Sequence, residues 1–78
     1  GSDLKEVLKT VEEAVKEIIK SSEELLQISR KILEISRVGV DEHEYISAIR
    51  EYLKALEKHI QILKKFIEIL KELIRAVS

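Results

Sequence analysis

The sequence lacks proline, cysteine, methionine and tryptophan altogether, and its two glycines are Gly1 and Gly39. Because there is no cysteine, the chain can form neither a disulfide nor a thiolate metal site, and cysteine usage says nothing about its redox compartment. Gly39 is the one residue inside the chain of a type that commonly ends a helix. Since the chain has 78 residues, we expect a single domain.

The charge balance argues against several classes of partner. Fourteen basic residues nearly cancel fifteen acidic ones, which leaves a formal net charge of −1. Such a chain has no long-range attraction for nucleic acid or anionic lipid, so we expect neither as a partner. The longest apolar runs are two residues, whereas a transmembrane helix needs roughly 20 apolar residues. We therefore expect no membrane span.

The first two residues, Gly1-Ser2, lead directly into charged sequence, so we expect no signal peptide. A Gly-Ser start without methionine is typical of the remnant of a cleaved expression tag. The sequence indicates no natural localisation, and this start suggests a soluble chain from recombinant cytoplasmic expression.

Apolar residues recur in steps of four and three over two long segments, Leu4–Ser36 and Tyr45–Val77. With Leu4 at heptad position d, positions a, d, e and g are mainly apolar, and b, c and f are polar. This 3.5-residue period predicts two left-handed supercoiled helices. Three a sites of the first segment depart from the apolar pattern: Ser22, Ser29 and Ser36. Three d sites of the second segment carry polar-capable rings: Tyr45, Tyr52 and His59.

The residues between the two segments predict a tight turn. Gly39 suits the left-handed position that follows a helix, and Asp41 suits an N-cap with Glu44 as its capping-box partner. Val40 is placed to contact both helix ends, and Asp3 with Glu6 forms a similar cap signal at the start. We therefore expect one all-α domain over residues 1–78, an antiparallel hairpin with helices near 3–37 and 41–77 and a turn near 38–41.

An antiparallel hairpin would bring the serines and the rings into common layers. The residue numbers of each pair add up to 81 in three successive layers: Ser36/Tyr45, Ser29/Tyr52 and Ser22/His59. The sequence therefore predicts buried hydrogen-bond layers formed by these six residues, with Ser21 beside Ser22 able to join. Two plainer readings stay open: serine hydroxyls bonded to the carbonyl four residues earlier, and tyrosines acting as ordinary core aromatics.

About four positions in seven are apolar in each helix, which is a wider face than a two-helix pairing can cover. An uncovered apolar patch of that length indicates an interface, and so short a chain gains stability by association. We expect the partner to be the chain itself, as a homodimeric four-helix bundle. Loops at the same end would match polar layers with polar layers. A homotrimer of hairpins and one half of a heteromeric bundle remain alternatives.

These features together resemble de novo designed helical-hairpin homo-oligomers with buried hydrogen-bond networks. The resemblance extends over the whole chain and rests on the Gly-Ser start, the single-glycine turn, the regular heptads and the stacked Ser, Tyr and His residues. It implies a self-assembly module whose specificity comes from the polar layers, without a natural ligand or a catalytic activity.

His59 is the residue with the most obvious chemical potential. A metal ion would need companion ligands, and no other His, Cys or carboxylate shares its a/d stripe. A Ser22–His59 nucleophile and base would lack an acidic residue to orient the imidazole and a glycine-rich oxyanion hole. We therefore expect no enzyme activity, no metal, no cofactor and no small-molecule ligand, and we expect His59 to be a hydrogen-bonded core residue.

Overall fold

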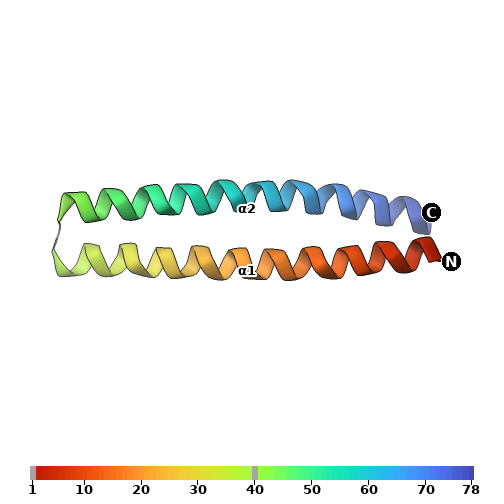
Figure 1. Cartoon of the computed structure of the whole chain (residues 1–78), viewed down its shortest axis with the longest axis horizontal. Coiled ribbons are helices and arrows are strands. Elements are labelled where there is room, and N and C mark those ends of the chain that lie inside the picture. The colour runs from red at the N-terminus through yellow and green to blue at the C-terminus, as the bar shows by residue number, and fades with distance from the viewer. Residues whose placement is uncertain (1, 40) are drawn as a thin grey trace.

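The computed structural model describes residues 2–39 and 41–78, with side chains from Leu4 onward. Helix α1 extends over Ser2–Val38 and helix α2 over Glu42–Val77, and the two lie antiparallel as a hairpin (Figure 1). The backbone measures 58 by 14 by 13 Å. The predicted all-α hairpin is confirmed, with helix limits one residue from those expected. Neither helix in the described part of the chain is long and apolar enough to cross a membrane.

The turn follows the sequence prediction at Gly39 and Asp41. Gly39 has a φ of +107°, a backbone conformation that strains other residue types, although a Cβ there would meet nothing within 4 Å. The Asp41 carboxylate accepts a hydrogen bond of 3.0 Å from the His43 N–H and so caps α2. The predicted contacts of Val40 lie outside the described residues. Helix α1 begins at Ser2, and the cap predicted at Asp3 lies outside the described side chains.

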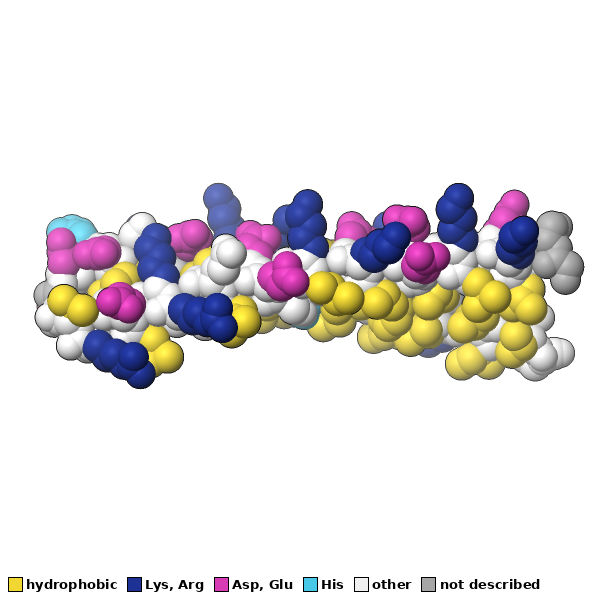
Figure 2. All heavy atoms as spheres, turned by 90° about the horizontal axis from the view of Figure 1, so that it is seen from below, with side chains coloured by type: hydrophobic (Ala, Val, Ile, Leu, Met, Phe, Trp, Pro, Cys, Tyr) yellow, Lys and Arg dark blue, Asp and Glu magenta, His cyan; other side chains and the backbone are white. Residues whose placement is uncertain are grey.

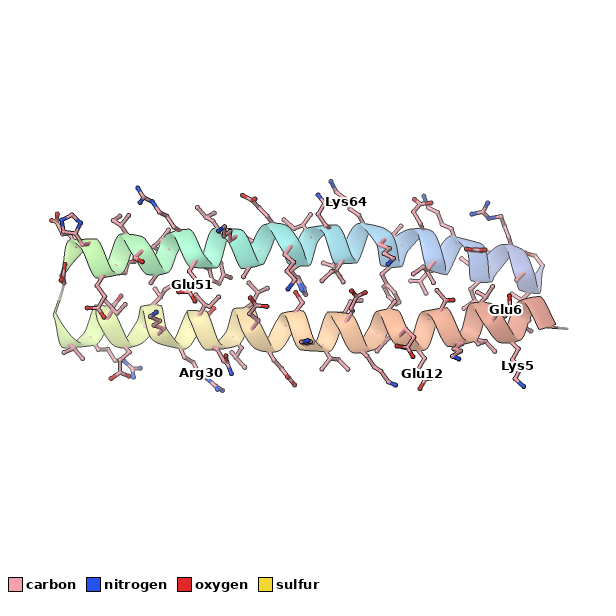
Figure 3. The ribbon with its side chains drawn as sticks, in the orientation of Figure 1. Lys5, Glu6, Glu12, Arg30, Glu51 and Lys64 are labelled. Carbon is pink, nitrogen blue, oxygen red and sulfur yellow. The ribbon has the colours of Figure 1, made fainter. Side chains whose placement is uncertain are left out.

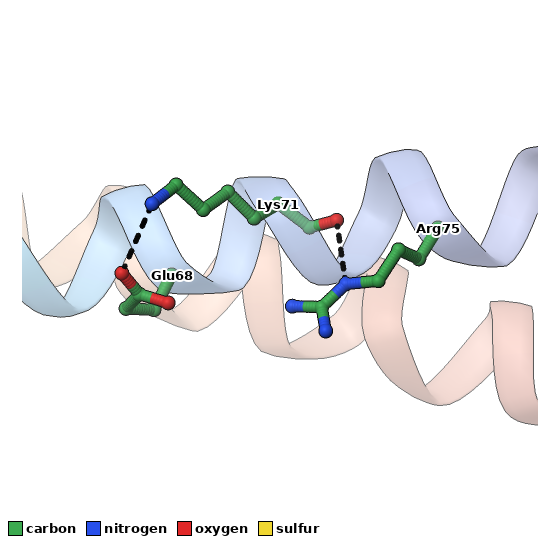
Figure 4. Close-up of polar contacts among 3 residues, drawn as sticks. All are labelled: Glu68, Lys71 and Arg75. Carbon is green, nitrogen blue, oxygen red and sulfur yellow. Dashed lines mark hydrogen bonds and ion pairs between the residues drawn. The ribbon is translucent and has the colours of Figure 1, made fainter.

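Ion pairs within each helix lie on the exposed sides. Lys71 Nζ is 3.4 Å from a carboxylate oxygen of Glu68, and the Arg75 Nε–H donates to the Lys71 carbonyl at 3.4 Å (Figure 4). On α1, Lys16 pairs with Glu12 at 3.6 Å. Pairs with this spacing contribute about 0.2–0.5 kcal/mol each to helix stability, so they support the helices without marking a binding site.

The contacts between the helices fix their register. Among the described side chains, three polar contacts cross the hairpin: Ser21–His59 at 2.8 Å, Lys31–Glu51 at 3.4 Å and Lys58–Glu24 at 3.8 Å. Their residue numbers add up to 80 in the first pair and 82 in the other two, on either side of the predicted 81. The antiparallel register expected from the sequence is therefore confirmed.

Candidate functional site: an open apolar face

The seam between α1 and α2 is formed by the g row of the heptads. The buried residues all occupy g positions: Ala14, Ser21, Ile28, Ile35, Ala48, Ala55 and Ile69. The d residues are half-buried, and Ser22 and Ser36 at a positions of α1 are exposed. The heptad pattern predicted that a and d residues meet in common layers across the hairpin, and this is wrong in detail. Small g residues let the two backbones approach on that side instead.

The g row pairs large residues with small ones, a pattern absent from the sequence-based prediction. In the observed register a large g residue lies level with a small one in three layers: Ile35 with Ala48, Ile28 with Ala55, and Ala14 with Ile69. This pairing keeps the filled volume similar from layer to layer, as close packing requires. It could have been found in the sequence, because these pairs have residue numbers that add up to 83.

A second set of large apolar side chains is left uncovered. These residues are 37% to 64% exposed, and we call them the open face: Leu8, Val15, Ile19, Leu26, Leu33, Ile46, Leu53, Ile60, Leu63, Ile67 and Ile74. They occupy a and e positions. None of the large side chains that the structure describes is fully buried. The hairpin therefore has a seam but no hydrophobic core of the usual kind.

The open face lies on one side of the molecule. The helices are antiparallel and meet at their g positions. The d, a and e rows of both helices therefore lie on the same side of the seam. The ion pairs Lys31–Glu51 and Lys58–Glu24 use c positions, on the other side of g. In the half of the hairpin near the termini, Figure 2 shows charged side chains along one edge and hydrophobic side chains along the opposite edge. Figure 3 shows Arg30 and Lys64 directed away from the partner helix.

The exposed area is large for the mass of the chain. The hairpin has an accessible surface of 6279 Å² at 9.0 kDa. A compact monomer of that mass exposes about 4,900 Å², so the excess is about 1,400 Å². A standard protein–protein interface covers about 800 Å² on each partner. The surface that the hairpin exposes in excess of a compact monomer is therefore larger than the share that one partner contributes to a standard interface.

The structure places one of the predicted ring residues in a hydrogen bond with a serine. His59 Nδ1 lies 2.8 Å from Ser21 Oγ, and Ser21 is only 4% exposed. The predicted layer partner Ser22 is exposed and makes no hydrogen bond through its hydroxyl within the described part of the chain. The pairing of Ser22 with His59 inside one hairpin is therefore wrong, because Ser21 at g points into the seam and Ser22 at a does not.

The other two serines bond to their own helix. The Ser29 hydroxyl donates to the Leu25 carbonyl at 2.8 Å, and the Ser36 hydroxyl donates to the Ile32 carbonyl at 3.0 Å. Tyr45 and Tyr52 are half-buried, and among the described residues their hydroxyls have no hydrogen-bond partner. Within one hairpin the predicted Ser–Tyr bonds are therefore not formed.

The described residues contain no group of three or more His, Cys, Asp or Glu side chains that could hold a metal ion. The arrangement instead offers an apolar surface with hydroxyl groups and one imidazole along it, which suits recognition of another protein surface. In comparisons with known proteins, no family model, curated protein or solved structure matched the chain.

Proposed function

We propose that the chain is a self-assembly module, in which two copies pack their open faces together as a homodimeric four-helix bundle. The observation that carries this proposal is the open face itself: eleven large apolar side chains, each more than a third exposed, lie on one side of the hairpin. Burying a large aliphatic side chain completely contributes about 1.5–3 kcal/mol, and these side chains have roughly half of that still to gain. Summed over two copies, the gain exceeds the cost of association.

The polar residues favour one orientation of the two copies. With loops at the same end, the loop half of each hairpin, which carries Ser29, Ser36, Tyr45 and Tyr52, meets the loop half of the other. With loops at opposite ends, those hydroxyls would be buried against aliphatic residues near the termini such as Leu8. An unpaired buried polar group costs about 1–3 kcal/mol, so the first arrangement is the more stable.

We infer a designed origin from the pattern of the sequence, and with it the absence of a natural ligand or catalytic role. The pairing of large with small residues in the g row and the glycine with φ of +107° after α1 agree with that inference. Each local choice supports the same hairpin, which is the consistency that design rules require. The polar layers would then set the specificity of assembly rather than its strength.

Size-exclusion chromatography with light scattering on the chain alone tests the proposal. We expect a single species with twice the mass of one chain, unchanged over a broad range of micromolar concentrations. A stable, folded monomer would contradict the proposal. A species of three chains would indicate the trimer of hairpins, and an ill-defined or aggregating sample would indicate one half of a heteromeric bundle.

A further inference from the structure

Tyrosine donors and serine acceptors at the same level along the hairpin axis are not bonded to each other. The O–H groups of Tyr45 and Tyr52 have no acceptor among the described residues, whereas Ser29 and Ser36 have used their O–H groups on carbonyls of α1. A hydroxyl that donates one bond still has lone pairs free to accept another. Tyr52 is level with Ser29, and Tyr45 is level with Ser36, in the observed register. Unused donors and unused acceptors thus occur in pairs that do not meet within one chain.

The same holds for His59 and Ser22. The Nδ1 atom of His59 is engaged by Ser21, which fixes the ring and leaves Nε2 without a partner among the described residues. Whichever tautomer is present, Nε2 keeps one unused donor or acceptor. The Ser22 hydroxyl is exposed at the same height of the hairpin and can act in either role.

We propose that these pairs are completed between two copies: Tyr52 donates to Ser29 of the second copy, Tyr45 donates to Ser36 of the second copy, and His59 Nε2 bonds to Ser22 of the second copy. This proposal rests on the proposed homodimer and adds which groups recognise each other across it. In each polar layer, each copy then contributes either the bond to Ser21 seen in the structure or a serine bonded to its own helix, plus one bond to the second copy.

Symmetry supplies the geometry. When both loops are at one end, the two-fold axis is parallel to the helices, so rotation leaves the height of every residue unchanged. The rotation places α1 of each copy diagonally from the other α1 and directly against α2 of the second copy. Residues that are level within one hairpin, such as Ser29 and Tyr52, are therefore also level between the copies. The a row of α1 faces this neighbour because the g row is occupied by the seam.

The opposite arrangement makes a different set of contacts. With loops at opposite ends, the two-fold axis is perpendicular to the helices and α1 packs antiparallel on α1 of the second copy. Ser22, near the middle of α1, would then meet Ser22 of the second copy, and Ser36 would lie near its Leu8. The tyrosine hydroxyls would have no serine within reach.

Disulfide cross-linking distinguishes the two arrangements, since the chain contains no cysteine of its own. Two single variants, Ser29→Cys and Tyr52→Cys, are mixed in equal amounts, oxidised and analysed by intact mass, which separates the mixed product from either self-linked product. We expect the mixed Ser29→Cys/Tyr52→Cys product to form readily, because adjacent helices bring such side chains within disulfide range. We expect Ser22→Cys alone to stay unlinked.

A mutant cycle provides a second measurement that does not depend on disulfide geometry. Tyr52→Phe and Ser29→Ala should each weaken the dimer about thirtyfold, because symmetry removes two copies of the same buried hydrogen bond from each dimer. The double variant should be no weaker than either single variant. The matched control is Ser47→Ala, at an exposed f position of α2, which should leave the dissociation constant unchanged and add nothing to Tyr52→Phe.

The outcomes separate this inference from the proposed function. A dimer by light scattering in which Ser22→Cys links to itself, or in which Ser29→Ala and Tyr52→Phe act independently, overturns the trans pairing while leaving the homodimer in place. A monomer by light scattering overturns the proposed function, and the trans pairing fails with it. A dimer with the mixed cross-link and a coupled cycle supports both.

Discussion

The seam and the open face differ in the size and the exposure of their residues. At the seam, four of the seven buried residues are Ala or Ser, and the flanking c row forms ion pairs such as Lys31–Glu51. On the open face, every residue is Val, Leu or Ile and remains 37% to 64% exposed. Small residues allow the helices to approach, yet they bury little apolar area. The hairpin geometry is therefore set by one row, and most of the apolar surface available for association lies in others.

The open face also changes along α1. Near the termini its members are the a residues Leu8 and Val15, and toward the loop they are the e residues Ile19, Leu26 and Leu33. Serines occupy the a positions in that second stretch. The apolar edge thus stays continuous where the polar row is inserted, so the loop half can carry hydroxyl groups without losing its contact surface.

Charging the open face should have the largest effect. The double variant Leu53→Glu/Ile60→Glu places two carboxylates per copy in the middle of the e row of α2, at positions that are 50% and 41% exposed in the hairpin. Burying unpaired charge in the interface costs several kcal/mol, so we expect loss of the oligomer by light scattering and a large loss of helical thermal stability by circular dichroism.

Gln61→Glu is the matched control for that variant, because it adds a carboxylate at an exposed f position next to Ile60. We expect it to keep the mass and nearly the same unfolding temperature. If Leu53→Glu/Ile60→Glu keeps the mass of the parent chain, the open face is not the interface.

Changing volumes at the seam should have the next largest effect. Ala48 is 1% exposed and lies level with Ile35 in the observed register. Ala48→Ile should overfill the layer at a cost of about 1–3 kcal/mol, and Ile35→Ala should leave a cavity that costs about 2–5 kcal/mol. The double variant swaps large and small across the seam, and denaturant unfolding should show that it recovers most of the loss.

Ala76→Ile is the control for the overfilled layer, since Ala76 is a g residue that is exposed near the end of α2. It should change the free energy of unfolding by a few tenths of a kcal/mol. Additive losses from Ala48→Ile and Ile35→Ala would show that the two residues do not share a layer.

The sequence predicted the fold well because its signals are local and repetitive. The apolar steps of four and three residues define the two helices, and Gly39 with Asp41 defines the turn between them. Because the turn is so short, the second helix can pack against the first only in the antiparallel direction. The register was also accessible, because five equally spaced heptads in each helix can be matched in few ways. What the pattern did not decide was which row faces the partner helix.

The rotation of the helices about their own axes decided the outcome at the candidate site. Because positions a, d, e and g are all mainly apolar, hydropathy defines a wide apolar face but not the row that contacts the other helix. Only the small size of several g residues indicates that row. That rotation sent Ser21 into the seam and Ser22 to the open face, so His59 met the neighbour of its predicted partner. The Ser–Tyr layers remain a prediction, now for contacts between copies.

Two adjacent serines lie on different sides of α1, because Ser21 faces the seam and Ser22 faces the same side as the open face. Ser21→Ala should cost about 1–3 kcal/mol, since His59 Nδ1 loses its partner at a position that is 4% exposed. Ser22→Ala should cost less and act through association alone. Nitrogen-15 NMR of the imidazole separates the roles: Ser21→Ala should shift Nδ1 of His59, and Ser22→Ala should shift Nε2. The exposed His43 provides a reference within the same spectrum. A shift of the same nitrogen in both variants would contradict the assignment of the two serines to different faces.

The ion pairs beside the seam should have the smallest effect. Lys58 lies 3.8 Å from Glu24, and both side chains remain about half or more exposed, at 65% and 48%. Exposed pairs typically contribute about 0.2–1 kcal/mol, because water screens the attraction and both side chains lose freedom. A mutant cycle of Lys58→Gln and Glu24→Gln should therefore give a coupling near the low end of that range, and 1 M salt should remove most of it because screening acts over about 3 Å there. Charge reversal of both residues should keep the pair and restore the stability that either reversal alone loses. A coupling of several kcal/mol would mean that the c row is buried in the assembly, and the interface would then have to include the side of the hairpin opposite the open face.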